Sequence, residues 1–174
     1  MAKISINLAS PASLSKAIAK VSKMASTATT LSNKIVHETT EKLLALILVN
    51  GAGIGNGNML SSIHANYVMG ANGCEIGQIL GADYIIYVEY GTGVVGASDP
   101  NPNAPVGWDY ASGEKIITTK DGKIGWYYFN AEIGRVVFTE GMKPRPFMRP
   151  AFEEVIVGLP STVKVRFEEW THTT

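Results

Sequence analysis

The residues best suited to catalysis or metal binding are few and scattered. His37, His64 and His172 lie far apart, and none has a second histidine or a carboxylate at metal-ligand spacing. Cys74 is the sole cysteine, so the chain lacks the residues for an internal disulfide or a cysteine-based zinc site. No Gly-x-Ser-x-Gly elbow marks a nucleophilic serine, although a Ser/His/Asp triad can assemble from distant residues. The sequence therefore predicts no enzyme, no cofactor and no metal.

A run of alternate glycines, from Gly51 to Gly57, resembles a phosphate-binding loop in composition. It lacks the Gly-Lys-Ser/Thr ending, and it follows a predicted helix instead of joining a strand to a helix. We therefore interpret residues 50–58 as a flexible Gly-rich loop.

Aromatic residues gather between positions 107 and 139. They are Trp108, Tyr110, Trp126, Tyr127, Tyr128 and Phe129. Such a cluster could bind a sugar or a base, but alternating aromatics on paired strands more often form core or a protein interface. A carbohydrate-binding module or a cell-wall hydrolase remains the alternative from another functional class.

Composition and charge indicate a globular protein that lacks the excess of basic residues expected of a domain that binds nucleic acid electrostatically. The 174 residues suffice for a single domain, and fifteen basic residues balance fifteen acidic ones. The longest apolar run, residues 43–49, is too short to span a bilayer, and the N-terminus has no apolar stretch of signal-peptide length.

The first half of the chain predicts a strand and a long helix. Residues 3–8 alternate polar and apolar, which is typical of a strand. Ser10 and Pro11 can begin a helix, and apolar residues then recur every three or four positions. A helix over residues 11–49 would be ~55–60 Å long at 1.5 Å per residue. Such a rod is long enough to reach a neighbouring molecule.

Residues 59–139 predict a β-rich part. Strands are expected at residues 59–69 and 74–80, around a Gly-Ala-Asn-Gly turn, and at 115–119, 125–129 and 135–139. Residues 83–90 suit either a strand or a short helix, with the helix favoured. Residues 91–107 are rich in glycine and proline and predict a loop.

The C-terminal part begins with a Pro-rich segment, residues 143–150, which ends at Pro150. Helical turns are expected over residues 151–157, where Glu153 and Glu154 favour the N-terminal end. Gly158 and Pro160 predict an interruption, and residues 161–170 could resume the helix or form an edge strand.

Two short motifs predict rigid local structure. Tyr-Val-Glu-Tyr-Gly-Thr-Gly, residues 87–93, ends an ordered element at a glycine turn; its Glu89 lacks a partner carboxylate, so a structural or interfacial role is expected. In Lys-Pro-Arg-Pro-Phe-Met-Arg-Pro, residues 143–150, three prolines fix φ and present Phe147 and Met148 in an extended form.

These motifs resemble a family of tailed-bacteriophage neck proteins, the head–tail joining, tail-completion or minor tail components. The resemblance rests on the long helix, the Met-Leu-Ser-Ser-Ile segment at residues 59–63, residues 87–93 and residues 144–151, in that order. The aromatic part, residues 107–139, is similar to an insertion in larger members. Members usually have Asp-Thr-Gly where this chain has Gly-Asn-Gly-Asn at residues 55–58.

The resemblance implies an α+β fold with a long N-terminal helix packed on an antiparallel sheet and a C-terminal helix. It implies a ring of copies in the virion neck or tail, made in the bacterial host cytoplasm. The ring would bind connector, stopper, tail-tube or terminator proteins, with DNA only as the passing genome and with no membrane. A tail terminator that caps the tube is the alternative within this class. The candidate interface residues are Leu60, Ile63, Glu89, Tyr90, Lys143, Arg145, Phe147, Met148 and Arg149. Among them, Arg145 and Arg149 are the preferred candidates for contact with another subunit. Phe147 is expected to seat the C-terminal helix on the sheet.

Overall fold

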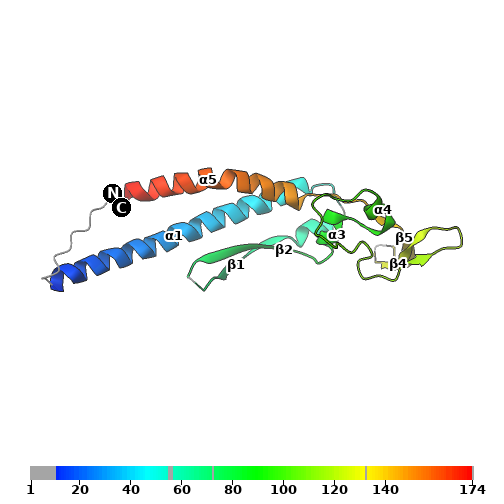
Figure 1. Cartoon of the computed structure of the whole chain (residues 1–174), viewed down its shortest axis with the longest axis horizontal. Coiled ribbons are helices and arrows are strands. Elements are labelled where there is room, and N and C mark those ends of the chain that lie inside the picture. The colour runs from blue at the N-terminus through cyan, green and yellow to red at the C-terminus, as the bar shows by residue number, and fades with distance from the viewer. Residues whose placement is uncertain (1–10, 55–56, 72, 132, 174) are drawn as a thin grey trace. The chain divides into compact units, whose positions relative to one another are not determined.

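The chain has an α+β fold with a long N-terminal helix, antiparallel sheets and a C-terminal helix, as the sequence predicts (Figure 1). The computed structural model describes residues 11–54, 57–71, 73–131 and 133–173, so the strand expected at residues 3–8 lies outside the described part. Two compact units are present, and each draws on separated segments. Unit 1 comprises Met1–Leu46, His64–Leu80 and Phe152–Thr174, and unit 2 comprises Ile47–Ile63 and Gly81–Ala151. The expectation of one domain stays a prediction.

Unit 1 contains most of helix α1 (Pro11–Asn50) and of helix α5 (Met148–Thr173), with the hairpin of β1 (His64–Met69) and β2 (Glu75–Leu80). The strands pair antiparallel, with His64 opposite Leu80 and Met69 opposite Glu75. Gly77 lies against the Thr40 side chain, where a Cβ atom would overlap the hydroxyl. A glycine in β2 therefore allows the hairpin to approach α1 closely.

Helix α5 is continuous, so the predicted interruption at Gly158 and Pro160 is wrong, as is the predicted start at residue 151. Proline inside a helix removes one backbone hydrogen bond and usually kinks or ends it. Here Val155 is buried, and Arg166 binds the Glu38 carboxylate of α1 at 2.8 Å. Tertiary interactions are thus present on both sides of the proline: Val155 is buried before it, and Arg166 pairs with Glu38 after it.

Unit 2 begins within the last turn of α1, at Ile47, and contains the short helix α2 (Gly57–Ser61). The predicted strand at residues 59–69 is therefore wrong in its first half, and the loop predicted at residues 50–58 ends before Gly57. Met59 is fully buried, and the hydroxyls of Ser61 and Ser62 donate to carbonyls three residues back. Those local bonds stabilise a helical turn over an extended strand.

The rest of unit 2 comprises α3 (Ile85–Tyr90), α4 (Gly93–Ser98), and strands β3 (Ile117–Thr118), β4 (Ile124–Asn130), β5 (Arg135–Thr139) and β6 (Gly141–Met142). The sheet order is β3-β4-β5, all antiparallel. The helix expected within residues 83–90 and the strand at residues 135–139 are confirmed. The loop expected at residues 91–107 is wrong in part, because α4 lies within it.

Candidate functional site

The carboxylate of Glu89, on α3, caps the N-terminus of α5. The side chain is 3% exposed, and its oxygens accept three backbone N–H groups. Phe147 N and Met148 N donate to Oε2 at 2.8 and 3.0 Å, and Arg149 N donates to Oε1 at 3.0 Å. Residues almost sixty positions apart in the chain therefore meet in one charge-assisted contact.

The first N–H groups of any α-helix have no partner within the helix. In α5 these belong to Phe147, Met148 and Arg149, and the next position is Pro150, which has no N–H. Glu89 and Pro150 together thus account for the first four positions. A negative charge at this end also interacts favourably with the helix dipole.

The acid at the start of α5 is not the one the sequence suggested. Because the helix begins at Met148, its first turn contains no acidic residue, and Glu153 and Glu154 lie beyond it. Glu89 supplies the negative charge from another element.

A second set of contacts runs from the same motif to residues 141–145. Arg145 N donates to the Val88 carbonyl at 2.8 Å, and Met142 N donates to Thr92 Oγ1 at 3.2 Å. Gly93 pairs with Gly141 across a short antiparallel bridge, at φ of 65° and 98°. A Cβ atom on Gly93 would overlap the Glu140 carbonyl, so this close approach requires glycine.

Two side chains from the loop after α4 hold the end of α3 in place. Asn101 Nδ2 donates to the Glu89 carbonyl at 2.9 Å, and Trp108 Nε1 donates to the Gly91 carbonyl at 3.1 Å. The Trp108 ring also packs against Tyr87 and Tyr90, with ring centroids 5.6 and 5.2 Å apart. Asn101 lies in a segment predicted only as a loop, and no sequence motif marks it for this contact.

The nine candidate interface residues therefore divide by burial. Ile63, Glu89 and Phe147 are 6, 3 and 0% exposed and lie inside unit 2, and their expected role at an interface stays a prediction. Phe147 lies against Gly51, just past the end of α1, and its carbonyl accepts a hydrogen bond from Asn50. These contacts connect Phe147 to the end of α1, and its expected seating of the C-terminal helix on the sheet stays a prediction.

The other six candidates remain at the surface in whole or in part. Lys143, Arg145 and Arg149 are exposed, and Leu60, Tyr90 and Met148 are half-buried. Lys143 forms an exposed ion pair with Asp99 at 3.5 Å.

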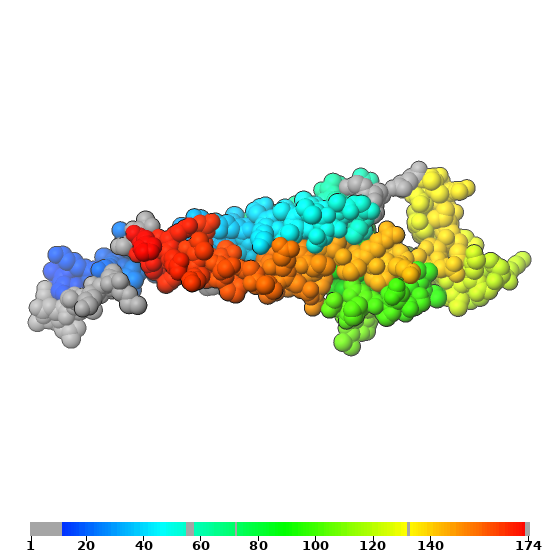
Figure 2. All heavy atoms as spheres, turned by 90° about the horizontal axis from the view of Figure 1, so that it is seen from above, coloured from blue at the N-terminus to red at the C-terminus, as the bar shows by residue number. Residues whose placement is uncertain are grey.

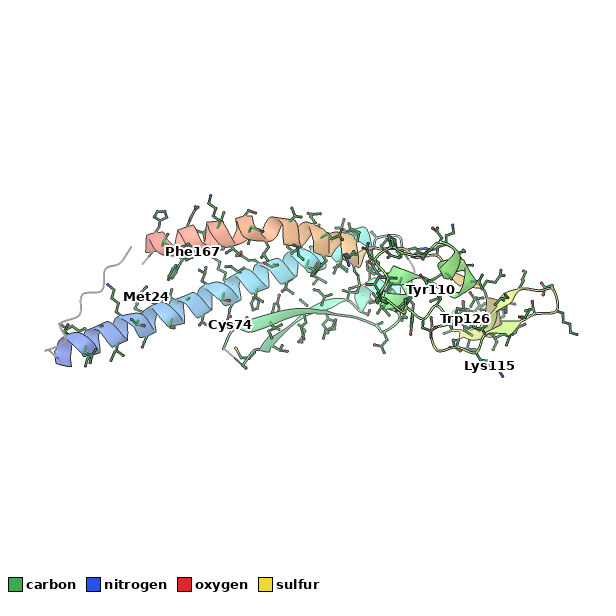
Figure 3. All side chains as sticks on the ribbon, in the orientation of Figure 1. Met24, Cys74, Tyr110, Lys115, Trp126 and Phe167 are labelled. Carbon is green, nitrogen blue, oxygen red and sulfur yellow. The ribbon has the colours of Figure 1, made fainter. Side chains whose placement is uncertain are left out.

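The aromatic cluster does not form one platform. Trp126 on β4, labelled in Figure 3, is buried, and Trp108 is occupied by the contacts above, whereas Tyr127, Tyr128 and Phe129 are exposed. Tyr127 and Phe129 share one face of the β4–β5 pair, opposite Phe138 and Val136. These residues form an exposed aromatic face suited to contact with another protein.

In unit 1, a polar cluster ties the hairpin to α1. His37 Nε2 lies 2.6 Å from Glu75 Oε2, and the His37 ring stacks on Tyr67 at 3.9 Å. The Tyr67 hydroxyl donates to Glu41 at 2.8 Å. Burial, followed by this hydrogen bond, raises the pKa of Tyr67 to about 12. The cluster joins two elements and gives His37 a structural partner.

A pocket of about 490 Å³ lies between α1 and α5 in unit 1. Gly158 contributes no side-chain bulk there, and the hydroxyl of Thr162 donates to the Gly158 carbonyl. On the lining, Glu38 and Arg166 neutralise each other.

Within the described residues, no group of three or more His, Cys, Asp or Glu side chains is placed to hold a metal ion. Among the helices of the described part, none is long and apolar enough to cross a membrane. Comparison of the chain with family models, curated proteins and solved structures gives no match.

Proposed function

We propose that this chain is a structural subunit of a tailed-bacteriophage virion, acting at the head–tail junction or the tail end in head–tail joining or tail completion. It would be made in the host cytoplasm and assemble as a ring through contacts between its own copies. Its other partners would be connector or stopper proteins on one side and tail-tube or terminator proteins on the other. DNA would pass through the ring as the genome.

The observation that carries the proposal is the contact at Glu89. The resemblance to the neck-protein family rests chiefly on two short motifs, and either could occur by chance. In this fold their backbones and side chains bind each other: the glutamate of residues 87–93 caps the helix that follows residues 144–147. A physical dependence between the motifs gives a reason for them to occur together.

The distribution of apolar surface supports an assembly role over catalysis. Large apolar side chains are exposed on α1, α5 and the β4–β5 pair, including Ile18, Phe167 and Phe129 at 58, 51 and 64%. Apolar patches on a soluble chain mark surfaces that other proteins cover. The balanced formal charge suits a subunit that surrounds DNA without gripping it.

Electron microscopy of the purified protein mixed with isolated tail tubes tests the proposal. Rings of the protein at the tube end, or joined heads and tails after heads are added, are the expected outcome. A monomer that ignores tubes and heads, and is instead retained by a glycan column through Tyr127 and Phe129, would favour the carbohydrate-binding alternative.

Caps at the ends of tubes that already have their full length would point to neck or tail completion. A tail terminator predicts a different result: without the protein, tubes grow to uncontrolled lengths. Portal, capsid and tail-tube genes beside this gene are the expected genomic setting for either role.

A further inference from the structure

Two helices of unit 1 each leave an apolar stripe exposed. On α1 the stripe is Leu14, Ile18 and Val21, at 45, 58 and 55% exposure. Their spacing of four and three residues repeats with Ala25 and Ala28, which are also exposed. Residues at this spacing lie on one side of a helix and form the seam of helix-to-helix packing.

The stripe on α5 has matching character. It consists of Phe152, Ile156, Val163 and Phe167, at 50, 50, 40 and 51% exposure. Steps of four, seven and four residues keep these side chains on one side of the helix. Figures 1 and 2 show α1 and α5 side by side, and Figure 3 labels Phe167 near the C-terminal end of α5.

Contacts between α1 and α5 of the same chain use other residues. Arg166 binds Glu38, and Gly158 lies near Lys42. Val155, one position before Ile156 and so turned about 100° from it, is buried at 6% exposure. The stripes are therefore additional to the packing inside the chain.

Charge indicates which surface covers the α1 stripe. Residues 11–37 contain four lysines and no carboxylate, whereas residues 152–173 contain four glutamates against one lysine and one arginine. Pairing α1 with α1 of another copy would bring two basic helices together. Pairing α1 with α5 of another copy brings a basic helix to an acidic one, which favours the encounter of the two helices.

We infer that the exposed stripe of α1 docks on the exposed stripe of α5 of a second copy of this chain. The lysines lie mainly on the side of α1 away from the stripe, so they act through the field of the helix and not as pairwise bridges. This inference rests on the proposed function only in requiring that copies bind each other. It names the surface through which they do so.

Cysteine cross-linking tests the pairing, in a C74S background that removes the one native thiol of the sequence. One tagged variant carries Ile18→Cys and an untagged one carries Val163→Cys, and a flexible bis-maleimide tolerates differences in register. We expect a cross-link between tagged and untagged chains in the mixture, and little in either variant alone. Lys20→Cys mixed with Val157→Cys is the matched control, since Val157 is 82% exposed but off the stripe.

A second measurement uses the full chain without cross-linking. The double variant Ile18→Asp and Val21→Asp should weaken self-association ~10-fold or more, because burying carboxylates in an apolar seam is unfavourable. Ser26→Asp, on an exposed position of the same helix off the stripe, should weaken it much less, because it lowers the positive charge of the helix but buries no carboxylate in the seam. Circular dichroism checks that each variant keeps its helices.

The outcomes separate this inference from the proposed function. If the wild type forms rings but the mixed cysteine variants give no cross-link, or Ile18→Cys alone cross-links as strongly as the mixture, the inference is overturned and the ring remains. If the wild type never self-associates, with or without tail tubes, both are overturned.

Discussion

Replacement of Glu89 by glutamine should destabilise unit 2 through the start of α5. Glutamine has nearly the shape of glutamate, but one of its two terminal atoms is an NH₂ donor. Its best orientation keeps the oxygen towards Phe147 N and Met148 N, which share Oε2, and leaves Arg149 N facing the NH₂ group. The variant thus loses one hydrogen bond, and the other two lose the help of the negative charge.

The magnitude follows from these losses. A hydrogen bond to a charged group contributes ~1.5–3 kcal/mol, and a charge at a partly buried helix end contributes up to ~2 kcal/mol. The neutral side chain avoids the cost of burying a charge, which offsets part of the loss. We expect Glu89→Gln to lower the free energy of unfolding by about 2–3 kcal/mol, and Glu89→Ala by about 4 kcal/mol because all three donors lose their acceptor.

Urea denaturation followed by circular dichroism measures the stability, and hydrogen exchange measures the three amides directly. Exchange at Phe147, Met148 and Arg149 should accelerate in Glu89→Gln. Glu154→Gln, an exposed position on the same helix, should change stability by less than ~0.5 kcal/mol. If Glu89→Gln matches this control in both stability and exchange, the capping argument is refuted.

Three further changes test other contacts. Gly93→Ala should lower the free energy of unfolding, measured by urea denaturation, by about 3 kcal/mol or more, because a Cβ atom would overlap the Glu140 carbonyl at a positive φ. Gly113→Ala, also at a positive φ but in open space, should lower it by only ~1 kcal/mol. Equal losses would contradict the close approach at Gly93. Because the pKa of Tyr67 is raised, the stability that its protonated form contributes is present below the ordinary tyrosine pKa of ~10 and is lost as the pH rises through about 12. Glu41→Gln should lower the pH at which half of the Tyr67 side chains are ionised, measured by ultraviolet absorbance of the phenolate. An unchanged midpoint would exclude the hydrogen bond to Glu41. The hydrogen bond from Arg166 lowers the pKa of Glu169, so this pair stabilises the fold above the ordinary glutamate pKa and loses that contribution as the pH falls through the lowered pKa. The difference in melting temperature between the wild type and Arg166→Gln should therefore shrink between about pH 7 and pH 3. A difference that stays constant would refute the ionic contribution.

Local patterns in the sequence predicted the elements that local interactions decide. The stripe of α1 and the β-branched run of β5 identify these elements because period and propensity act within a few residues. The start of α2 and the continuity of α5 were missed for a different reason. Burial of Met59 and the ion pair of Arg166 with Glu38 depend on residues distant in the chain.

The candidate site shows the same division. The sequence singled out both motifs, since glycines after Glu89 and prolines around Phe147 indicate fixed backbone. Their mutual contact was not predictable, because a carboxylate that caps a helix from another element leaves no spacing signal. The sequence also concealed the need for a cap, because a helix that starts at residue 151 has Glu153 and Glu154 in its first turn, and only the observed start at Met148 places them beyond it.

A virion-joining assay tests directly whether this chain is needed to join phage heads to tails. A phage or prophage lacking this gene would be supplied with the wild-type protein, with Glu89→Gln or with Glu154→Gln, and particles would be counted by electron microscopy. We expect full heads separate from tails without the protein, joined virions with the wild type and Glu154→Gln, and fewer joined virions with Glu89→Gln. Normal joined virions in the absence of the protein would refute a role in head–tail joining or tail completion.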